Sequence, residues 1–320
     1  MANNPIGLLA QTSAASLLAI TPEYWTVRSA RSPGAATIAY DRDTLAIQTS
    51  RMTVDGLSLR YARSKKPGAP TVLFLSPLPQ SLHCYEPIWT ALSDEADLVA
   101  VDLPGFGGSE GGMDQMSFAA QSAFLEQIVA KLELSDVHIV APDIAMPVAM
   151  HYVMHRAHAA RSILIGDGPG VLPSADGSLV RKIVGSAFWR LMVRANGART
   201  FLATATQVGY LHYQMSVAEL QDYVDAYVGR VDQLVAYFAS YPEGLKTVDP
   251  HIDGLQLPVQ VFWGDQDAFL GCENARLLHQ RLPRSRLTIF ENCGHFCYQD
   301  KSEEFTQMVR TWVHGGYRTA

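Results

Sequence analysis

Three ionisable side chains follow segments with the pattern of buried strands, each near the point where the strand would end. Asp143 follows "VHIVAP", Asp267 follows "PVQVFWGDQ", and His295 lies in "NCGHF" after "SRLTIFE". In open α/β sheets, ligands bind beyond the carboxyl ends of the strands, so these side chains are candidates for one site. Such a set supplies a nucleophile, a general base and a carboxylate that orients the base.

Asp143 defines the type of reaction that this set supports. A carboxylate is already ionised at neutral pH, and the N-terminus of a following helix favours its charge. Attack on an acyl carbon would give a reactive anhydride, whereas attack on a saturated carbon with a leaving group gives an alkyl ester that histidine-activated water can hydrolyse. The competing interpretation is that Asp143 only caps a helix.

The elements that must position these side chains alternate along the chain. From Arg51 onward, eight β-branched or apolar runs alternate with helical patterns, which predicts a mostly parallel eight-stranded sheet with helices on both faces. Residues 171–249 break the alternation and predict a helical cap without strands, inserted after the sixth strand. The core then comprises residues 46–170 and 250–320, and residues 1–45 form a helical or irregular extension.

Over about residues 51 to 316, the sequence resembles the α/β-hydrolase family, whose members follow the order nucleophile, acid, histidine. "DLPGFGGSEG" and "SPLP" resemble family loops, and "APDIA" at 141–145 stands where G-x-S-x-G is usual. The exchange of serine for Asp143 resembles the aspartate-nucleophile branch, which contains epoxide hydrolases and haloalkane dehalogenases. "GGSEG" at 107–111 matches the serine pattern in letters only, because it follows a loop, so Ser109 is not expected to be the nucleophile.

The resemblance also implies roles for the remaining residues. Asp267 would orient His295, with Asp265 a weaker candidate and Asp167, after the sixth strand, a possible substitute. The backbone N–H groups of Leu78 and Ile144 would form the oxyanion hole.

Residues of the predicted cap help to distinguish an epoxide from a halide as the leaving group. Epoxide hydrolases protonate the opening oxygen with cap tyrosines, for which Tyr237 and Tyr241 are the candidates, and Trp189 stands near the position of a first tyrosine. Phe238 occupies the expected position of the second tyrosine. Leu78 and Ile144 offer no side-chain donor for a halide, so dehalogenation is the alternative. A hydrolase-fold protein that binds a ligand without hydrolysing it is a further alternative, from another class.

Composition excludes several other functions. Twenty-five basic and 31 acidic residues give a net charge of −6, which argues against a nucleic-acid-binding surface. The four cysteines lack metal-site spacing, and no phosphate-binding loop occurs, so no metal or other cofactor is expected. The N-terminus lacks the basic residues of a signal peptide, and no apolar run is long enough to span a membrane, which predicts a cytoplasmic protein without a membrane partner. The expected substrate is a bulky apolar small molecule, for instance from secondary metabolism, with water as co-substrate.

Overall fold

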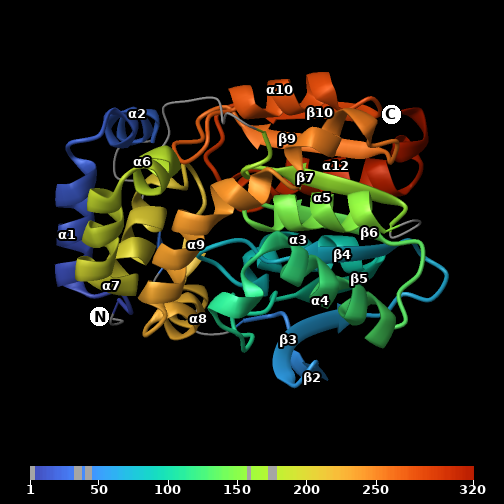
Figure 1. Ribbon diagram of the computed structural model, residues 1–320, viewed down its shortest axis with the longest axis horizontal. Coiled ribbons are helices and arrows are strands. Elements are labelled where there is room, and N and C mark those ends of the chain that lie inside the picture. Colours follow the sequence, from blue (N-terminus) through green and yellow to red (C-terminus); the bar gives the residue numbers. More distant parts are fainter. Residues whose placement is uncertain (1–3, 32–37, 40–44, 157–159, 172–178) are drawn as a thin grey trace.

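The computed structural model describes residues 4–31, 38–39, 45–156, 160–171 and 179–320. Eight strands form one sheet in the order β10-β9-β7-β6-β4-β5-β3-β2, in which β3 pairs antiparallel with β2 and β5 and all other pairs are parallel (Figure 1). The predicted eight-stranded, mostly parallel sheet is therefore confirmed. The strands are β2 (Ser50–Val54), β3 (Leu57–Ser64), β4 (Thr71–Leu75), β5 (Asp97–Val101), β6 (His138–Pro142), β7 (Ser162–Gly166), β9 (Val259–Gly264) and β10 (Ser285–Phe290).

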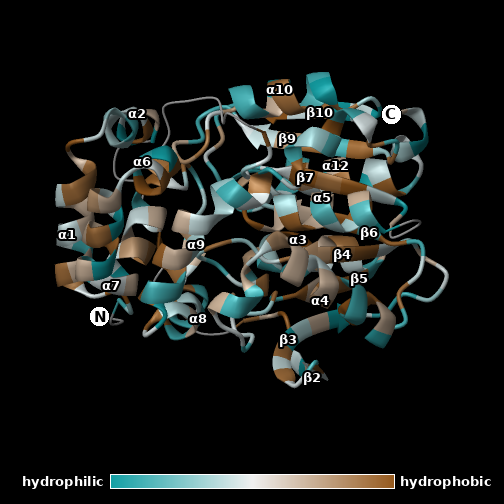
Figure 2. Ribbon diagram, in the orientation of Figure 1, coloured by the Kyte–Doolittle hydropathy of each residue, from teal (hydrophilic) through white to brown (hydrophobic). Residues whose placement is uncertain are grey.

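The sequence explains the central and edge strands differently. β6, β7 and β9 are buried along their whole length, because parallel strands covered on both faces need continuous apolar runs (Figure 2). The β2–β3 hairpin turns at Asp55 and Gly56, which have φ angles of 48° and 80°. Asp-Gly is the pair that a tight hairpin turn with two positive φ angles favours.

Helices connect and cover the parallel strands. α3 packs against α12, and α4 packs against α5. α5 follows Asp143 directly and ends at His155, after which Arg156 takes an extended conformation. The core helices are α3 (Glu86–Ser93), α4 (Phe118–Lys131), α5 (Ala145–His155), α10 (Glu273–Arg281), α11 (Cys297–Asp300) and α12 (Ser302–Val313), with short 3-10 turns η1 (Leu82–Tyr85), η2 (Met113–Gln115), η3 (Asp249–Gly254) and η4 (Gly316–Thr319).

Between β7 and β9 lie the helices of the cap, which are α6 (Leu179–Gly185), α7 (Ala187–Val208), α8 (Val217–Tyr227) and α9 (Val231–Leu245). Gly197, with a φ of 77°, interrupts α7. The expectation of a cap without strands is wrong in one detail, because β8 (Met215–Ser216) pairs in parallel with β1 (Ile38–Ala39). This two-residue pairing uses a partner from the extension, so no strand pattern within the cap could reveal it.

The extension forms two helices, α1 (Leu8–Leu18) and α2 (Pro22–Ala30). Both pack against α7, and in Figure 1 they lie at the edge of the molecule, beyond the cap helices and away from the sheet. Among the described residues, no helix has both the length and the hydropathy needed to cross a membrane.

Candidate active site

Asp143 occupies a sharp turn between β6 and α5. Its φ is 51°, a left-handed conformation that is uncommon outside glycine. Ala141 and Ala145 on either side are fully buried, and a Cβ at Gly168 would stand only 2.2 Å from the carbonyl oxygen of Asp143. Small neighbours therefore allow the turn that projects the carboxylate beyond the end of the strand.

The carboxylate of Asp143 contacts two other predicted site residues. Its Oδ2 accepts a hydrogen bond of 2.8 Å from the backbone N–H of Leu78, and its Oδ1 lies 3.7 Å from Nε2 of His295. The second distance is too long for a direct hydrogen bond but short enough for strong electrostatic attraction. A helix cap would accept a hydrogen bond from the first turn of α5. The Asp143 carboxylate instead accepts one from Leu78, in the loop after β4.

Contacts of its backbone and of its side chain hold His295 in place. Its backbone N–H donates to the carbonyl of Gly209 at the end of α7, and its Nδ1 lies 2.8 Å from Oδ2 of Asp267. The rings of Phe269 and Phe296 stand edge-on to the imidazole at 4.9 and 4.8 Å. Burial disfavours the imidazolium, but Asp267 and then Asp143 outweigh it and hold the pKa of His295 well above its ordinary value. The two carboxylates therefore favour the imidazolium form of His295 in the resting protein.

The structure distinguishes between the three acid candidates by their contacts. Asp267 bonds His295 with one oxygen, and its other oxygen accepts the N–H groups of Phe269 and Leu270. Asp265 instead accepts the backbone N–H of Cys293 at 3.1 Å. Asp267 is thus the carboxylate that the fold brings to the histidine.

Asp167 lies at the end of β7 with a φ of 50° and is 1% exposed. Its Oδ1 accepts the N–H of Gly264 and the thiol of Cys297, and its Oδ2 has no hydrogen-bond partner among the described residues. Burial and then the charge of Asp267 raise the pKa of Asp167 well above its ordinary value. The raised pKa favours the neutral form of this carboxyl group, which stabilises an imidazolium less than a carboxylate does, and none of its hydrogen bonds among the described residues goes to His295.

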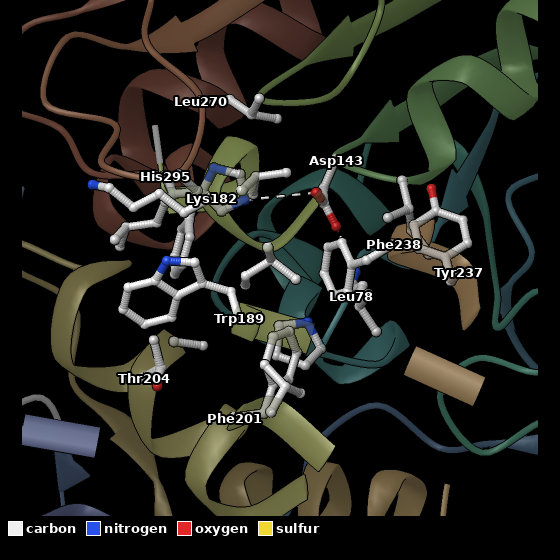
Figure 3. Close-up of a pocket in the computed structure, with 18 of the residues that line it drawn as sticks. Leu78, Asp143, Lys182, Trp189, Phe201, Thr204, Tyr237, Phe238, Leu270 and His295 are labelled. Atoms are coloured by element: carbon white, nitrogen blue, oxygen red, sulfur yellow. Dashed lines mark hydrogen bonds and ion pairs between the residues drawn. The ribbon is translucent and has the colours of Figure 1, made fainter. Parts of the chain in front are cut away.

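An apolar cavity covers Asp143 and His295 (Figure 3). All three predicted cap residues line it, namely Trp189 from α7 and Tyr237 and Tyr241 from α9. Leu78 and Ile144, the two predicted oxyanion-hole residues, line it from the core. Sequence reasoning missed Lys182 and three residues of the extension, Leu17, Leu18 and Thr21, which also line the cavity. No motif marks these four, because they reach the cavity only through the packing of α1 and α6 against α7.

The hydroxyl of Tyr237 is buried without a hydrogen-bond partner among the described residues. A buried donor without a partner costs roughly 1–3 kcal/mol, so a substrate oxygen or a water molecule is the expected partner. Burial, and then the charge of Asp143, raises the pKa of Tyr237 and of Tyr241. Both phenols therefore keep their protons at neutral pH.

The hydroxyl of Ser109 is used in hydrogen bonds to the backbone. It is fully buried in the loop after β5, where its hydroxyl donates to the carbonyl of Asp102 at 2.6 Å and accepts from the N–H of Arg60 at 2.8 Å. Among the described residues, no three metal-ligating side chains form a cluster that would hold an ion.

A family model described as the alpha/beta hydrolase fold matches residues 70–302. The chain therefore belongs to the α/β-hydrolase fold family, which supports a hydrolase. It is 22% identical over 294 residues to human monoacylglycerol lipase ABHD6, covering 88% of this chain and 86% of the relative. It is 20% identical to the uncharacterized hydrolase YugF of Bacillus subtilis, covering 82% and 97%.

Solved structures show the same fold at low identity. A bacterial membrane phospholipase A, described as a virulence factor, superposes with a TM-score of 0.69 at 20% identity, over 98% of this chain and 93% of that one. The haloalkane dehalogenase DbeA from Bradyrhizobium elkani superposes with a TM-score of 0.72 at 20% identity, over 84% and 98%. These likenesses extend the agreement in fold to nearly the whole chain.

Proposed function

We propose that this protein opens an epoxide on an apolar small molecule through a covalent ester on Asp143, which His295-activated water then hydrolyses. The observation that carries the proposal is a carboxylate at the strand-to-helix turn, held by Leu78 and 3.7 Å from a histidine that is itself paired with Asp267. A carboxylate in this position favours attack on a saturated carbon over the acyl transfer of a serine hydrolase.

In the first step, Oδ1 of Asp143 attacks an epoxide carbon and the carbon–oxygen bond of the ring breaks. The electron pair goes to the ring oxygen, which takes a proton from the phenol of Tyr237 or Tyr241. The product is a hydroxyalkyl ester of Asp143 and a phenolate. Tyr237 lines the cavity that contains Asp143, and its buried hydroxyl has no hydrogen-bond partner among the described residues, which supports this assignment.

In the second step, His295 becomes the base. Ester formation removes the negative charge of Asp143, which is one of the two charges that hold the proton on His295. His295 gives its proton to the phenolate, which restores the phenol, and neutral His295 then takes a proton from water as the water oxygen adds to the ester carbon. The tetrahedral oxyanion is stabilised by the N–H groups of Leu78 and Ile144. On collapse the bond from the carbonyl carbon to the alkyl oxygen breaks, and that oxygen takes the proton that remained on the oxygen added from water. This releases the diol and leaves the Asp143 carboxylate and the His295 imidazolium, as in the resting protein.

Trapping the ester tests this proposal. A His295→Ala variant should form the ester but fail to hydrolyse it, so intact mass spectrometry after incubation with aryl epoxides should show a mass gain of one whole epoxide, and peptide mapping should locate the adduct at Asp143. A panel of haloalkanes serves as the parallel arm. An alkyl adduct formed with loss of halide would instead establish dehalogenation, with the Trp189 indole as a donor available in the cavity. Absence of an adduct from either panel would favour a protein that binds its ligand without hydrolysis.

The cap tyrosines provide a second prediction. In the His295→Ala background, changing both Tyr237 and Tyr241 to Phe should slow ester formation by about 10²- to 10⁴-fold, the usual contribution of a general acid. Single-turnover mass spectrometry measures this rate. Tyr223→Phe is the matched control, because Tyr223 is also a buried cap tyrosine with an unpartnered hydroxyl but does not line the cavity. Equal rates in the double variant and the control would remove the tyrosines from the mechanism.

A further inference from the structure

The helical extension forms part of the cavity wall. We define the N-terminal segment as residues 8–31, which comprise α1 and α2. Leu17, Leu18 and Thr21 of this segment line the cavity that contains Asp143 and His295. Asp143 and His295 follow the strands β6 and β10 of the sheet, whereas α1 and α2 lie beyond the cap helices, away from the sheet (Figure 1). The cavity is therefore bounded by the reacting groups on one side and by the N-terminal segment on the other.

Specific contacts fix this segment to the cap. Glu23 of α2 forms an ion pair of 2.6 Å with Lys182 of α6, a cavity-lining residue. Arg31 donates to the carbonyl of Tyr210 at 2.7 Å, and the side chain of Gln207 donates to the carbonyl of Gln11 at 3.0 Å. A separate apolar cluster joins the segment to the cap and to the loop after β9, with Leu18, Tyr24, Val27, Leu179, Val208, Leu211 and Ala268 as members. The wall is thus packed in place.

This side of the cavity offers little to a polar ligand. Leu17 and Leu18 share it with apolar side chains of α6 and α7. The hydroxyls of Thr21, Thr200 and Thr204, which also line the cavity, already donate to backbone carbonyls within their own segments. The Lys182 ammonium forms an ion pair with Glu23, and the side-chain amide of Asn196 donates to the carbonyl of Met192. An uncharged hydrocarbon group is the chemistry that fits here, with apolar side chains supplied by Leu17, Leu18, Ile183, Met192 and Val193.

We propose that the N-terminal segment receives the hydrocarbon tail of the substrate and that Leu17 limits the length of that tail. The inference rests on the proposed function for the position of the reacting group at Asp143. It assigns the substrate class as a molecule with an epoxide at one end and an extended apolar body directed toward α1. Leu17 is the adjustable position, because it is only partly buried, whereas Leu18 belongs to the buried cluster and Thr21 is hydrogen-bonded.

Two substitutions of opposite size test the inference. Leu17→Ala should extend the tail that the protein accepts, and Leu17→Trp should shorten it. Leu9→Ala and Leu9→Trp are matched controls, because Leu9 lies on the same helix, is 86% exposed and does not line the cavity. Binding of straight-chain primary alcohols from hexanol to dodecanol, measured by calorimetry, reports tail binding without any reaction.

In the wild type, affinity should rise roughly fourfold per methylene until the tail meets the wall and then stop rising. The plateau should move to longer alcohols in Leu17→Ala and to shorter ones in Leu17→Trp, while the Leu9 variants match the wild type. The kcat/KM values for terminal epoxides from epoxyhexane to epoxydodecane should show the same displacement. A displaced plateau in alcohol binding without epoxide turnover would contradict the proposed reaction but would support the role of Leu17 in limiting tail length. Identical profiles for the Leu17 and Leu9 variants, or no alcohol binding by the wild type, would contradict the inference that the N-terminal segment receives the hydrocarbon tail.

Discussion

An Asp143→Asn variant is expected to lose epoxide hydrolysis by about 10⁴- to 10⁶-fold, the scale seen when a covalent nucleophile is removed. The amide keeps an oxygen that can accept from the N–H of Leu78, so the turn should retain its geometry, but the amide lacks the charge and nucleophilicity needed to open the ring. Steady-state rates and the absence of any adduct in an Asp143→Asn/His295→Ala double variant measure this loss.

Asp167→Asn provides the control for that experiment. Asp167 also follows a buried strand and has nearly the same φ, 50° against 51°, so the two substitutions place the same strain on the backbone. Because burial and the charge of Asp267 raise the pKa of Asp167 and so favour its neutral form, an amide changes little, and the variant should retain activity within about tenfold. Comparable losses in both variants would indicate a structural effect and would argue against Asp143 as the nucleophile.

Asp267→Asn is expected to slow turnover by about 10³- to 10⁴-fold, because the amide no longer fixes the tautomer of His295 or stabilises its imidazolium. The loss should fall on hydrolysis of the ester, since formation of the ester needs only Asp143 and the proton donor. Rapid-quench mass spectrometry should therefore show the ester accumulating in this variant during turnover.

Asp265→Asn is the neighbouring control, because its recorded hydrogen bond is from the N–H of Cys293, which an amide oxygen can also accept. It should retain near wild-type rates without ester accumulation. If Asp267→Asn were active while Asp167→Asn was not, the acid would lie at the end of β7 instead.

Local patterns predicted the sheet because each strand carries its own signal. Continuous apolar runs mark β6, β7 and β9, and Asp55-Gly56 marks the hairpin. The end of each strand then placed Asp143, Asp267 and His295 at one edge. The order of these residues along the chain was sufficient to propose the set, and the structure supplies the distances between them.

Other features depend on packing between distant segments, which no local pattern encodes. The unpartnered hydroxyl of Tyr237 reflects what surrounds α9 and not its own sequence. The α1 sequence "LLAQTSAASLL" has no marked apolar stripe, so its docking on α7 and its place at the cavity could not be inferred.

The hydrogen bond from Leu78 makes the two oxygens of Asp143 inequivalent. Oδ2 accepts from the N–H group, so under the proposed mechanism Oδ1, which faces His295, would be the oxygen that attacks the epoxide. Hydrolysis breaks the bond between the ester carbonyl carbon and that same oxygen, so the diol leaves with an atom that belonged to the protein. An oxygen from water takes its place. Under this mechanism, each diol would carry the oxygen atom that water supplied to Asp143 in the preceding turnover. The isotopic composition of that oxygen would therefore report the solvent of the preceding turnover.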